Sequence, residues 1–162
     1  MRFQLDDAEA MVAFGVRLAG LLHAGDLLLL DGPVGAGKTT LTRGIGAGLR
    51  VRGPITSPTF VIARLHPSLV DGPPLLHVDA YRLGGVDDLA DLDLEMDTER
   101  AVTVAEWGLG IGEVLAESYL TVRISRAVGE AADAGAPDEV RQLEVQGRGG
   151  RWRGQDFATL LD

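Results

Sequence analysis

The chain has 162 residues and no cysteine, and its 15 Lys and Arg residues against 24 Asp and Glu residues give a formal net charge of −9 at pH 7. This length is typical of one domain with one hydrophobic core, so we expect residues 1–162 to form a single domain. The absence of cysteine excludes disulfide and zinc-thiolate scaffolds. The acidic charge opposes attraction to nucleic-acid phosphates, so any connection to RNA is expected to run through a partner protein.

Membrane and targeting segments are not expected either. The first residues lead into Asp6 and Asp7 rather than into an apolar signal core. The longest apolar runs, such as residues 27–30, are far shorter than the roughly 18 residues of a membrane span. The composition therefore predicts a soluble, cytoplasmic protein with no membrane partner.

The N-terminal third predicts a helix, a strand and a second helix. Asp6 and Glu9 have the spacing of a capping box, and Gly25 is the expected stop of the helix that follows. Apolar residues recur at helical spacing in this segment: Met11, Phe14, Leu18, Leu21 and Leu22. Residues 27–31 then form a short apolar run, which is typical of a parallel strand covered on both faces. A second helix is predicted over 39–49, although its three glycines weaken it.

Two further apolar strands are predicted to end in carboxylates. Residues 75–79 end in Asp79, and residues 101–105 lead directly into Glu106. A short strand is also predicted over 60–63. Strands that alternate with helical segments indicate an α/β fold with a parallel sheet.

The C-terminal half is less regular. The acidic stretch 86–99 predicts one short helix and a turn, and the alternation over 119–124 predicts a half-exposed strand. After an Ala/Gly/Asp-rich loop over 128–139, residues 142–145 are expected to pair with that strand as an antiparallel neighbour. The basic segment 148–153 has two interpretations, an RNA contact or, as we favour, a solvated tail.

The strongest motif lies between the strand 27–31 and the helix 39–49. Gly32, Gly37, Lys38 and Thr39 fit the G-x-x-x-x-G-K-[ST] pattern, and Lys38 is the only lysine of the chain. In this context the backbone N–H groups and the helix N-terminus bind phosphate, which an ordinary glycine-rich turn does not do. The predicted nucleotide contacts are Gly32, Pro33, Val34, Gly35, Ala36, Gly37, Lys38, Thr39 and Thr40.

A magnesium ion is expected beside the phosphates. Thr39 supplies one hydroxyl ligand, and Mg²⁺ requires further oxygen ligands. Asp79 and Glu106 are the candidates, because the carboxyl ends of parallel strands open onto the crevice at the phosphate loop. One carboxylate is expected to hold the metal and the other to orient water, and the spacing leaves open which does which. The chain has no Asn, and thus no Asn-Lys-x-Asp guanine motif, which favours ATP over GTP.

The order of four segments resembles the TsaE family, formerly called YjeE. These segments are GPVGAGKTT (32–40), TSPTF (56–60), HVDAYRL (77–83) and AEW (105–107). The resemblance implies a P-loop NTPase-like three-layer α/β fold, with a parallel core sheet extended by antiparallel strands. It further implies a small bacterial P-loop ATPase that uses Mg²⁺. Because no second domain or arginine finger is found to close the site, we expect slow hydrolysis by the chain alone and faster hydrolysis with its partners.

That family is required to form threonylcarbamoyladenosine in tRNAs that read codons beginning with A. The resemblance implies TsaB and TsaD as partners, with tRNA reached only through the complex. Lys38 and Thr39 match by position the family's nucleotide and Mg²⁺ residues, and Glu106 matches its second metal ligand. Asp79 matches an essential aspartate that acts on the attacking water.

Two other functions are open. A small P-loop kinase of a metabolite would need an acceptor pocket and an arginine-bearing lid, and no segment with the pattern of a lid is found. A nucleotide sensor that does not hydrolyse ATP would not need both carboxylates. Four residues each have two possible roles. Thr59 is part of a switch loop that senses the γ-phosphate or a residue of a turn, and Trp107 covers the nucleotide or packs in the crevice. Arg82 binds phosphate or forms an ion pair on the surface, and His77 is a catalyst or, as we favour, a packed core residue.

Overall fold

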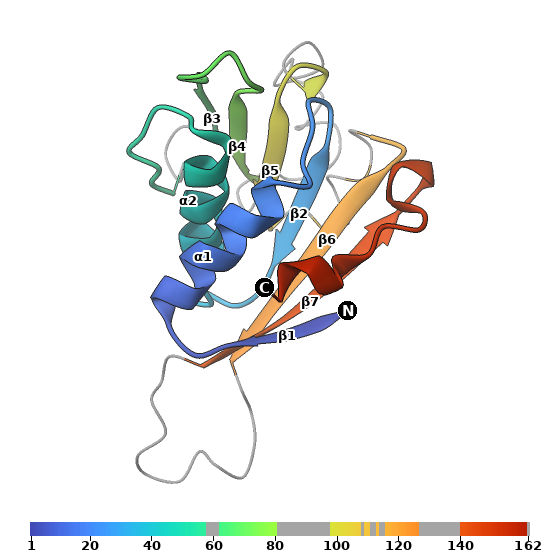
Figure 1. The fold of residues 1–162 in the computed structure, drawn as a ribbon. Coiled ribbons are helices and arrows are strands. Elements are labelled where there is room, and N and C mark those ends of the chain that lie inside the picture. The colour runs from blue at the N-terminus through green and yellow to red at the C-terminus, as the bar shows by residue number, and fades with distance from the viewer. Residues whose placement is uncertain are drawn as a thin grey trace, which may run out of the picture.

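The computed structural model describes residues 1–57, 62–80, 98–107, 109–110, 113, 116–126 and 140–161. Within these residues the fold is built on one seven-stranded sheet with the order β1-β7-β6-β2-β5-β4-β3 (Figure 1). The strands are β1 (Arg2–Leu5), β2 (Leu27–Asp31), β3 (Ala63–His66), β4 (Leu75–Asp79), β5 (Val102–Glu106), β6 (Tyr119–Arg126) and β7 (Arg141–Arg148).

The four central strands are parallel, and the outer strands are antiparallel. β5 pairs in parallel with both β2 and β4, and β6 pairs in parallel with β2. β3 joins β4, and β7 joins β6 and β1, in antiparallel pairs. The expected α/β fold with a parallel core and antiparallel extensions is therefore confirmed. The carboxyl ends of β2, β4 and β5 lie at one edge of the sheet.

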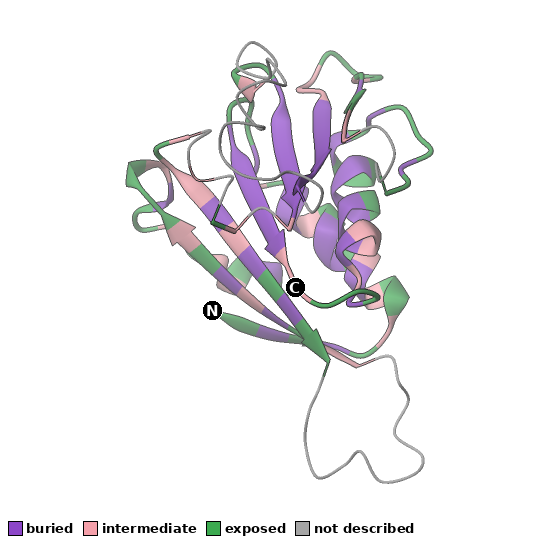
Figure 2. Ribbon diagram, turned by 180° about the vertical axis from the view of Figure 1, so that it is seen from behind, coloured by how far each residue is buried: buried purple, intermediate pink, exposed green. Residues whose placement is uncertain are grey.

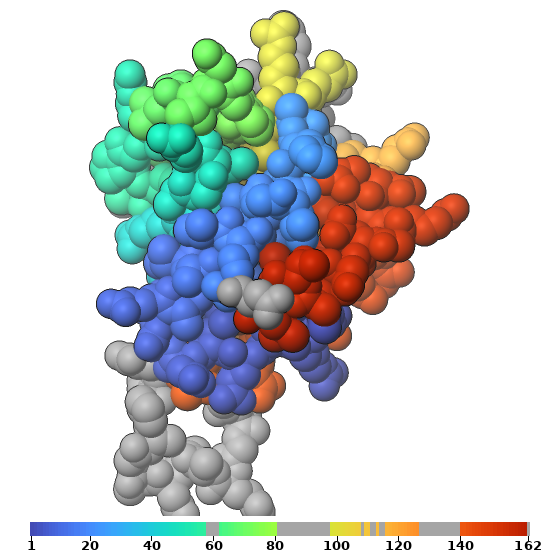
Figure 3. Space-filling model, in the orientation of Figure 1, coloured from blue at the N-terminus to red at the C-terminus, as the bar shows by residue number. Residues whose placement is uncertain are grey.

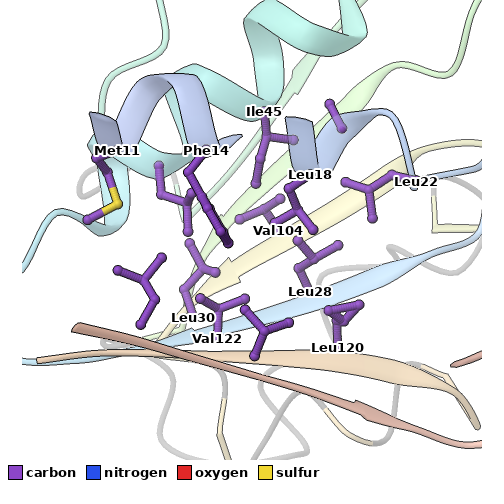
Figure 4. Close-up of a cluster of buried hydrophobic side chains, with 14 of the residues drawn as sticks. Met11, Phe14, Leu18, Leu22, Leu28, Leu30, Ile45, Val104, Leu120 and Val122 are labelled. Atoms are coloured by element: carbon purple, nitrogen blue, oxygen red, sulfur yellow. The ribbon is translucent and has the colours of Figure 1, made fainter. Parts of the chain in front are cut away.

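Two helices, α1 (Ala8–Ala19) and α2 (Lys38–Leu49), cover one face of the sheet. Glycines let them pack closely: a Cβ on Gly15 would lie 2.6 Å from the carbonyl oxygen of Leu41, and a Cβ on Gly44 would meet the carbonyl oxygen of Val12. The glycines that weaken α2 as an isolated helix therefore fit its packing against α1. Figure 4 shows the core beneath the helices, where Phe14, Leu18, Ile45 and the strand residues Leu28, Leu30 and Val104 meet.

The burial pattern separates the central strands from the outer ones. Every residue of β4 and β5 is buried, whereas β6 alternates between buried and more exposed positions (Figure 2). Side chains that alternate along β4 and β5 therefore enter two buried layers. Leu75 and Val104 pack under the helices, and Leu76 and Ala105 pack on the opposite face.

Several predicted boundaries are wrong. The N-terminal residues form β1, whose alternating burial the sequence analysis did not use. α1 is capped by Asp7, whose carboxylate accepts a 2.7 Å hydrogen bond from the Ala10 N–H, rather than by Asp6. The helix ends at Ala19, well before Gly25. The strand expected over 60–63 begins at Ala63 and continues to His66, because it pairs with β4.

The predicted strand pair in the C-terminal part is confirmed and longer than expected, but the solvated tail is wrong. Gly150–Trp152 and Phe157–Leu160 form short 3-10 helices, and the latter packs against α1. In Figure 3 this red segment lies against the blue N-terminal part. Trp152 is buried, and Arg151 binds the carboxylate of Asp26 through two hydrogen bonds of 3.0 and 2.9 Å. Long-range pairing with Asp26 therefore overrides the polar composition of this segment.

Several predicted features lie outside the described residues: Thr59, Arg82, the loop 128–139 and most of the acidic stretch 86–99. Among the residues that are described, no helix has the length and apolar character that crossing a membrane requires.

Candidate functional site

The loop 32–37 carries the chain from β2 to the first turn of α2. Gly35 has a φ of 76° and Gly37, which precedes α2, has a φ of 111°, values that side chains rarely allow. The turn places the N-terminus of α2, with its unpaired N–H groups, at the carboxyl edge of the sheet. A crevice of about 450 Å³ opens there. Its lining residues are Val34, Gly35, Gly37, Lys38, Thr39, Thr40, Ser57, Asp79, Glu106 and Trp107.

The crevice brings together most of the residues predicted from the sequence. The carboxylates of β4 and β5 lie in it beside the lysine and threonines of α2. Gly32, Pro33 and Ala36 are not among its lining residues; they shape the loop instead. The carbonyl oxygens of Gly32 and Pro33 accept hydrogen bonds from Lys38, and the Ala36 side chain is buried.

The Lys38 ammonium is held over the loop. Its Nζ donates hydrogen bonds to the carbonyl oxygens of Gly32, at 2.6 Å, and Pro33, at 3.0 Å. It also lies 3.8 Å from the centre of the Trp107 ring, a cation–π distance. Burial lowers the pKa of the Lys38 ammonium from its ordinary value. Nearby carboxylates oppose that effect, led by Glu106.

Asp79 and Glu106 are neighbours across two parallel strands. The β4–β5 register pairs Asp79 directly with Glu106 at the last position of both strands. Each residue is about 95% buried, with exposed fractions of 5% for Asp79 and 4% for Glu106. Two buried carboxylates side by side repel each other, and the positive charge of Lys38 offsets part of this repulsion.

Glu106 is joined to the phosphate loop and to the sheet by two hydrogen bonds on one oxygen. The Thr39 hydroxyl donates to Oε1 of Glu106 at 2.9 Å. The Nε2 atom of His77 lies 2.8 Å from the same oxygen. His77 is predicted from the sequence to be a packed core residue, and it is fully buried, but its ring also contacts the Glu106 carboxylate. The signal was its position two residues before Asp79, on the same face of β4.

The residues present fit a magnesium ion. A hydroxyl that donates its proton to Glu106 keeps its lone pairs for a cation, so Thr39 and Glu106 offer adjacent hard oxygen atoms. Mg²⁺ is usually bound by one or two carboxylates together with substrate phosphates and water. Within the described residues, no group of three or more His, Cys, Asp or Glu side chains is arranged so that it could hold a metal ion by itself.

Trp107 is half-buried and lines the crevice beside Lys38. This place is compatible with both predicted roles, crevice packing and cover of a bound nucleotide. Its φ of 59° is unusual for a bulky side chain, and its N–H donates to the Leu30 carbonyl oxygen at 2.9 Å. Nothing in the sequence pattern signals such a backbone conformation.

Two arginines flank the other side of the loop. Arg141 Nε donates to the carbonyl oxygen of Ala36 at 3.1 Å. A Cβ on Gly35 would lie 3.4 Å from a guanidinium nitrogen of Arg126, which pairs with Arg141 in the β6–β7 register. Neither arginine is signalled by a local sequence pattern, because their proximity to the loop depends on the long-range pairing of β6 with β2.

Comparisons with known proteins show the family of this chain. Residues 5–133 match the family model of the threonylcarbamoyl adenosine biosynthesis protein TsaE. A Streptomyces coelicolor protein named tRNA threonylcarbamoyladenosine biosynthesis protein TsaE is 59% identical over 93% of this chain and 99% of its own length. A Mycobacterium leprae protein of the same name is 46% identical over 73% of this chain and 78% of its own. The crystal structure of Bacillus subtilus YdiB matches with a TM-score of 0.69 and 27% identity, over 99% of this chain and 90% of that one.

Proposed function

The chain belongs to the TsaE family and takes part in threonylcarbamoyladenosine biosynthesis, and we propose that it acts there as a Mg²⁺-dependent ATPase. The observation that carries the proposal is the hydrogen bond between Thr39 at the start of α2 and Glu106 at the end of β5, in the crevice that also holds Lys38 and Asp79. This arrangement combines a phosphate-binding loop, a cation and two carboxylates.

The loop and Lys38 bind the phosphates of ATP. The N–H groups at the start of α2 face the crevice and, with the helix dipole, favour an anion. The Lys38 ammonium already binds two carbonyl oxygens of the loop, so it lies within reach of a phosphate group that replaces them. The Trp107 ring beside it restricts access of water to this ammonium.

Thr39 and Glu106 would hold the magnesium ion. When bound, Mg²⁺ neutralises negative charge that develops on the β- and γ-phosphates. Glu106 keeps the Thr39 hydroxyl turned so that its lone pairs face the crevice. The two residues therefore arrange each other, and neither has to reorganise when a cation binds.

Asp79 is the residue that orients the attacking water. It lies at the same level as Glu106 on the neighbouring strand and lines the crevice, but Thr39 bonds to Glu106 rather than to Asp79. This difference supports the division of roles in which Glu106 binds the metal and Asp79 aligns water and accepts its hydrogen bond.

The proposal includes TsaB and TsaD as the partners that stimulate hydrolysis. The family's role in tRNA modification and the net charge of −9 together favour contact with tRNA through these proteins rather than directly. ATP is the proposed nucleotide, because the chain has no Asn for a guanine-recognition motif.

The test is Mg²⁺-dependent phosphate release from ATP and from GTP, by the chain alone and with purified TsaB and TsaD. Lys38→Ala serves as the blank, since loss of one charge-stabilising contact is expected to lower the rate by about 10²–10³-fold. Release from ATP that increases with the partners supports the proposal. Equal rates with and without the partners contradict the accessory role, and a phosphorylated acceptor in place of free phosphate indicates a kinase.

Asp79→Asn separates hydrolysis from binding. It retains the size of the side chain and is expected to bind ATP while losing phosphate release. If Asp79→Asn supports full tRNA modification while Lys38→Ala does not, nucleotide binding is the functional event and the protein is a sensor.

A further inference from the structure

His77 occupies an unusual position for a polar side chain. It lies in the middle of β4 with an exposed fraction of 0%, on the face that packs under the helices. Its neighbours two residues away on this strand face are Leu75, in the core, and Asp79, in the crevice. The imidazole therefore lies between the hydrophobic core and the two carboxylates.

The hydrogen bond between His77 and Glu106 determines the tautomer of the imidazole. A carboxylate oxygen only accepts hydrogen bonds, so at 2.8 Å from Oε1 of Glu106 the Nε2 atom carries the proton. The Nδ1 atom is buried and has no hydrogen-bond partner among the described residues. A proton on Nδ1 would thus be a buried donor without an acceptor, which disfavours the other tautomer.

Glu106 is consequently held from two sides. The hydroxyl of Thr39 reaches Oε1 from α2, and the ring N–H of His77 reaches the same oxygen from β4. With two donors on Oε1, the rotation of this carboxylate is restricted, and its second oxygen is left for other ligands. Glu106 is itself buried, so these donors also replace hydration that the carboxylate loses.

We propose that His77 is a positioning residue, which holds the Glu106 carboxylate in the orientation that binds Mg²⁺ beside Thr39. The inference rests on the proposed function, since it assigns the metal to Glu106. His77 is not a catalytic residue, because its side chain is inaccessible and is not among the described residues that line the crevice. It acts only through Glu106.

We expect the loss of the His77 side chain to weaken Mg²⁺ binding rather than metal-free nucleotide binding. Loss of a hydrogen bond to a metal-binding side chain typically weakens metal affinity by about 10–100-fold. The contacts of Lys38 with the loop do not involve His77, so metal-free nucleotide binding should change by less than about twofold. A purely structural role would lower thermal stability without this selectivity.

The experiment compares three substitutions in the full-length chain. His77→Gln can place its amide N–H near the Nε2 position, whereas His77→Asn is too short and His77→Leu has no donor. Binding of a non-hydrolysable ATP analogue is measured in EDTA and across a Mg²⁺ titration. His66→Leu is the matched control. His66, on β3, is also a buried histidine, but its ring lies 3.0 Å from the carbonyl oxygen of Arg52 and makes no contact with Glu106.

His77→Leu and His77→Asn are expected to raise the Mg²⁺ concentration for half-maximal binding by about tenfold or more, with His77→Gln near the wild-type value. Equal Mg²⁺ dependence in all variants, or an effect of His66→Leu as large as that of His77→Leu, overturns the inference. If His77→Leu does not fold, the difference in Mg²⁺ dependence between His77→Gln and His77→Asn tests the inference. Wild-type binding without any Mg²⁺ dependence refutes the proposed metal site itself, which separates the two failures.

Discussion

Arg151→Leu is expected to destabilise the protein, because it removes the pair that fixes the C-terminal segment. Two guanidinium nitrogens of Arg151 bind the two carboxylate oxygens of Asp26, at 3.0 and 2.9 Å. The guanidinium also donates to the carbonyl oxygen of Leu21 at 2.8 Å and lies 4.2 Å from the centre of the Trp152 ring. The substitution leaves the buried Asp26 carboxylate, which is 6% exposed, without this cation.

The size of the expected destabilisation follows from how deeply the Arg151–Asp26 ion pair is buried. Removal of one partner from a buried ion pair costs about 3–5 kcal/mol. The Arg151 side chain is 29% exposed, so solvent screening lowers this value, and we expect a loss of about 2–3 kcal/mol in the free energy of unfolding. For a chain of this size, each kcal/mol corresponds to about 2–4 °C, which predicts a decrease in Tm of about 4–12 °C.

Thermal unfolding followed by circular dichroism measures the change. Arg153→Leu is the matched control, since Arg153 is an exposed arginine two residues away and its loss should change stability by less than about 0.5 kcal/mol. In an Asp26→Asn background the effect of Arg151→Leu should shrink, because no buried charge is then left unpaired. Equal Tm values for the Arg151 and Arg153 variants would refute the reasoning.

Three further predictions follow from single contacts. Thr39→Val should slow Mg²⁺-dependent phosphate release by about 10–100-fold, since a hydrogen bond to a charged group contributes about 1.5–3 kcal/mol. Thr39→Ser keeps the hydroxyl and should release phosphate at nearly the wild-type rate. Equal rates in the two variants would contradict the role of the hydroxyl. Burial lowers the pKa of His66, so its contribution to stability is complete above pH 6.5, the unfolded value, and is lost as the pH falls toward the folded pKa. The Tm of the wild type should therefore fall more than that of His66→Asn between pH 8 and 5, and a constant difference would disprove this linkage. Gly44→Ala should cost about 1–3 kcal/mol because its Cβ meets the backbone of α1, whereas Gly150→Ala, with no atom within 4 Å, should be neutral in denaturant unfolding; similar values for both would exclude the steric cause.

The parts of the site that the sequence predicted share one property. The phosphate loop is a local motif, and Asp79 and Glu106 each follow a recognisable apolar strand. Parallel strands in one sheet bring their carboxyl ends together, so local patterns were sufficient to place these residues in one crevice.

The parts that the sequence did not predict depend on distant partners. His77 bonds to Glu106, which is 29 residues away in the sequence. The apolar strand pattern around His77 predicts that it is buried, but it does not predict this contact. Arg151 is separated from Asp26 by 125 residues, so its basic neighbourhood suggested a solvated tail. The position of Trp107 follows from a φ of 59°, a backbone conformation that its residue type does not favour.

The charges around the phosphate loop are divided between its two sides. Buried carboxylates of β4 and β5 lie on one side, and arginines at the ends of β6 and β7 lie on the other, against Gly35 and Ala36. Lys38 carries one positive charge against the two carboxylates of Asp79 and Glu106, so the carboxylate side of the crevice has an excess of negative charge. In the proposed function, a cation held by Thr39 and Glu106 would offset this excess where the phosphates bind. Phosphate binding is therefore expected to strengthen with Mg²⁺.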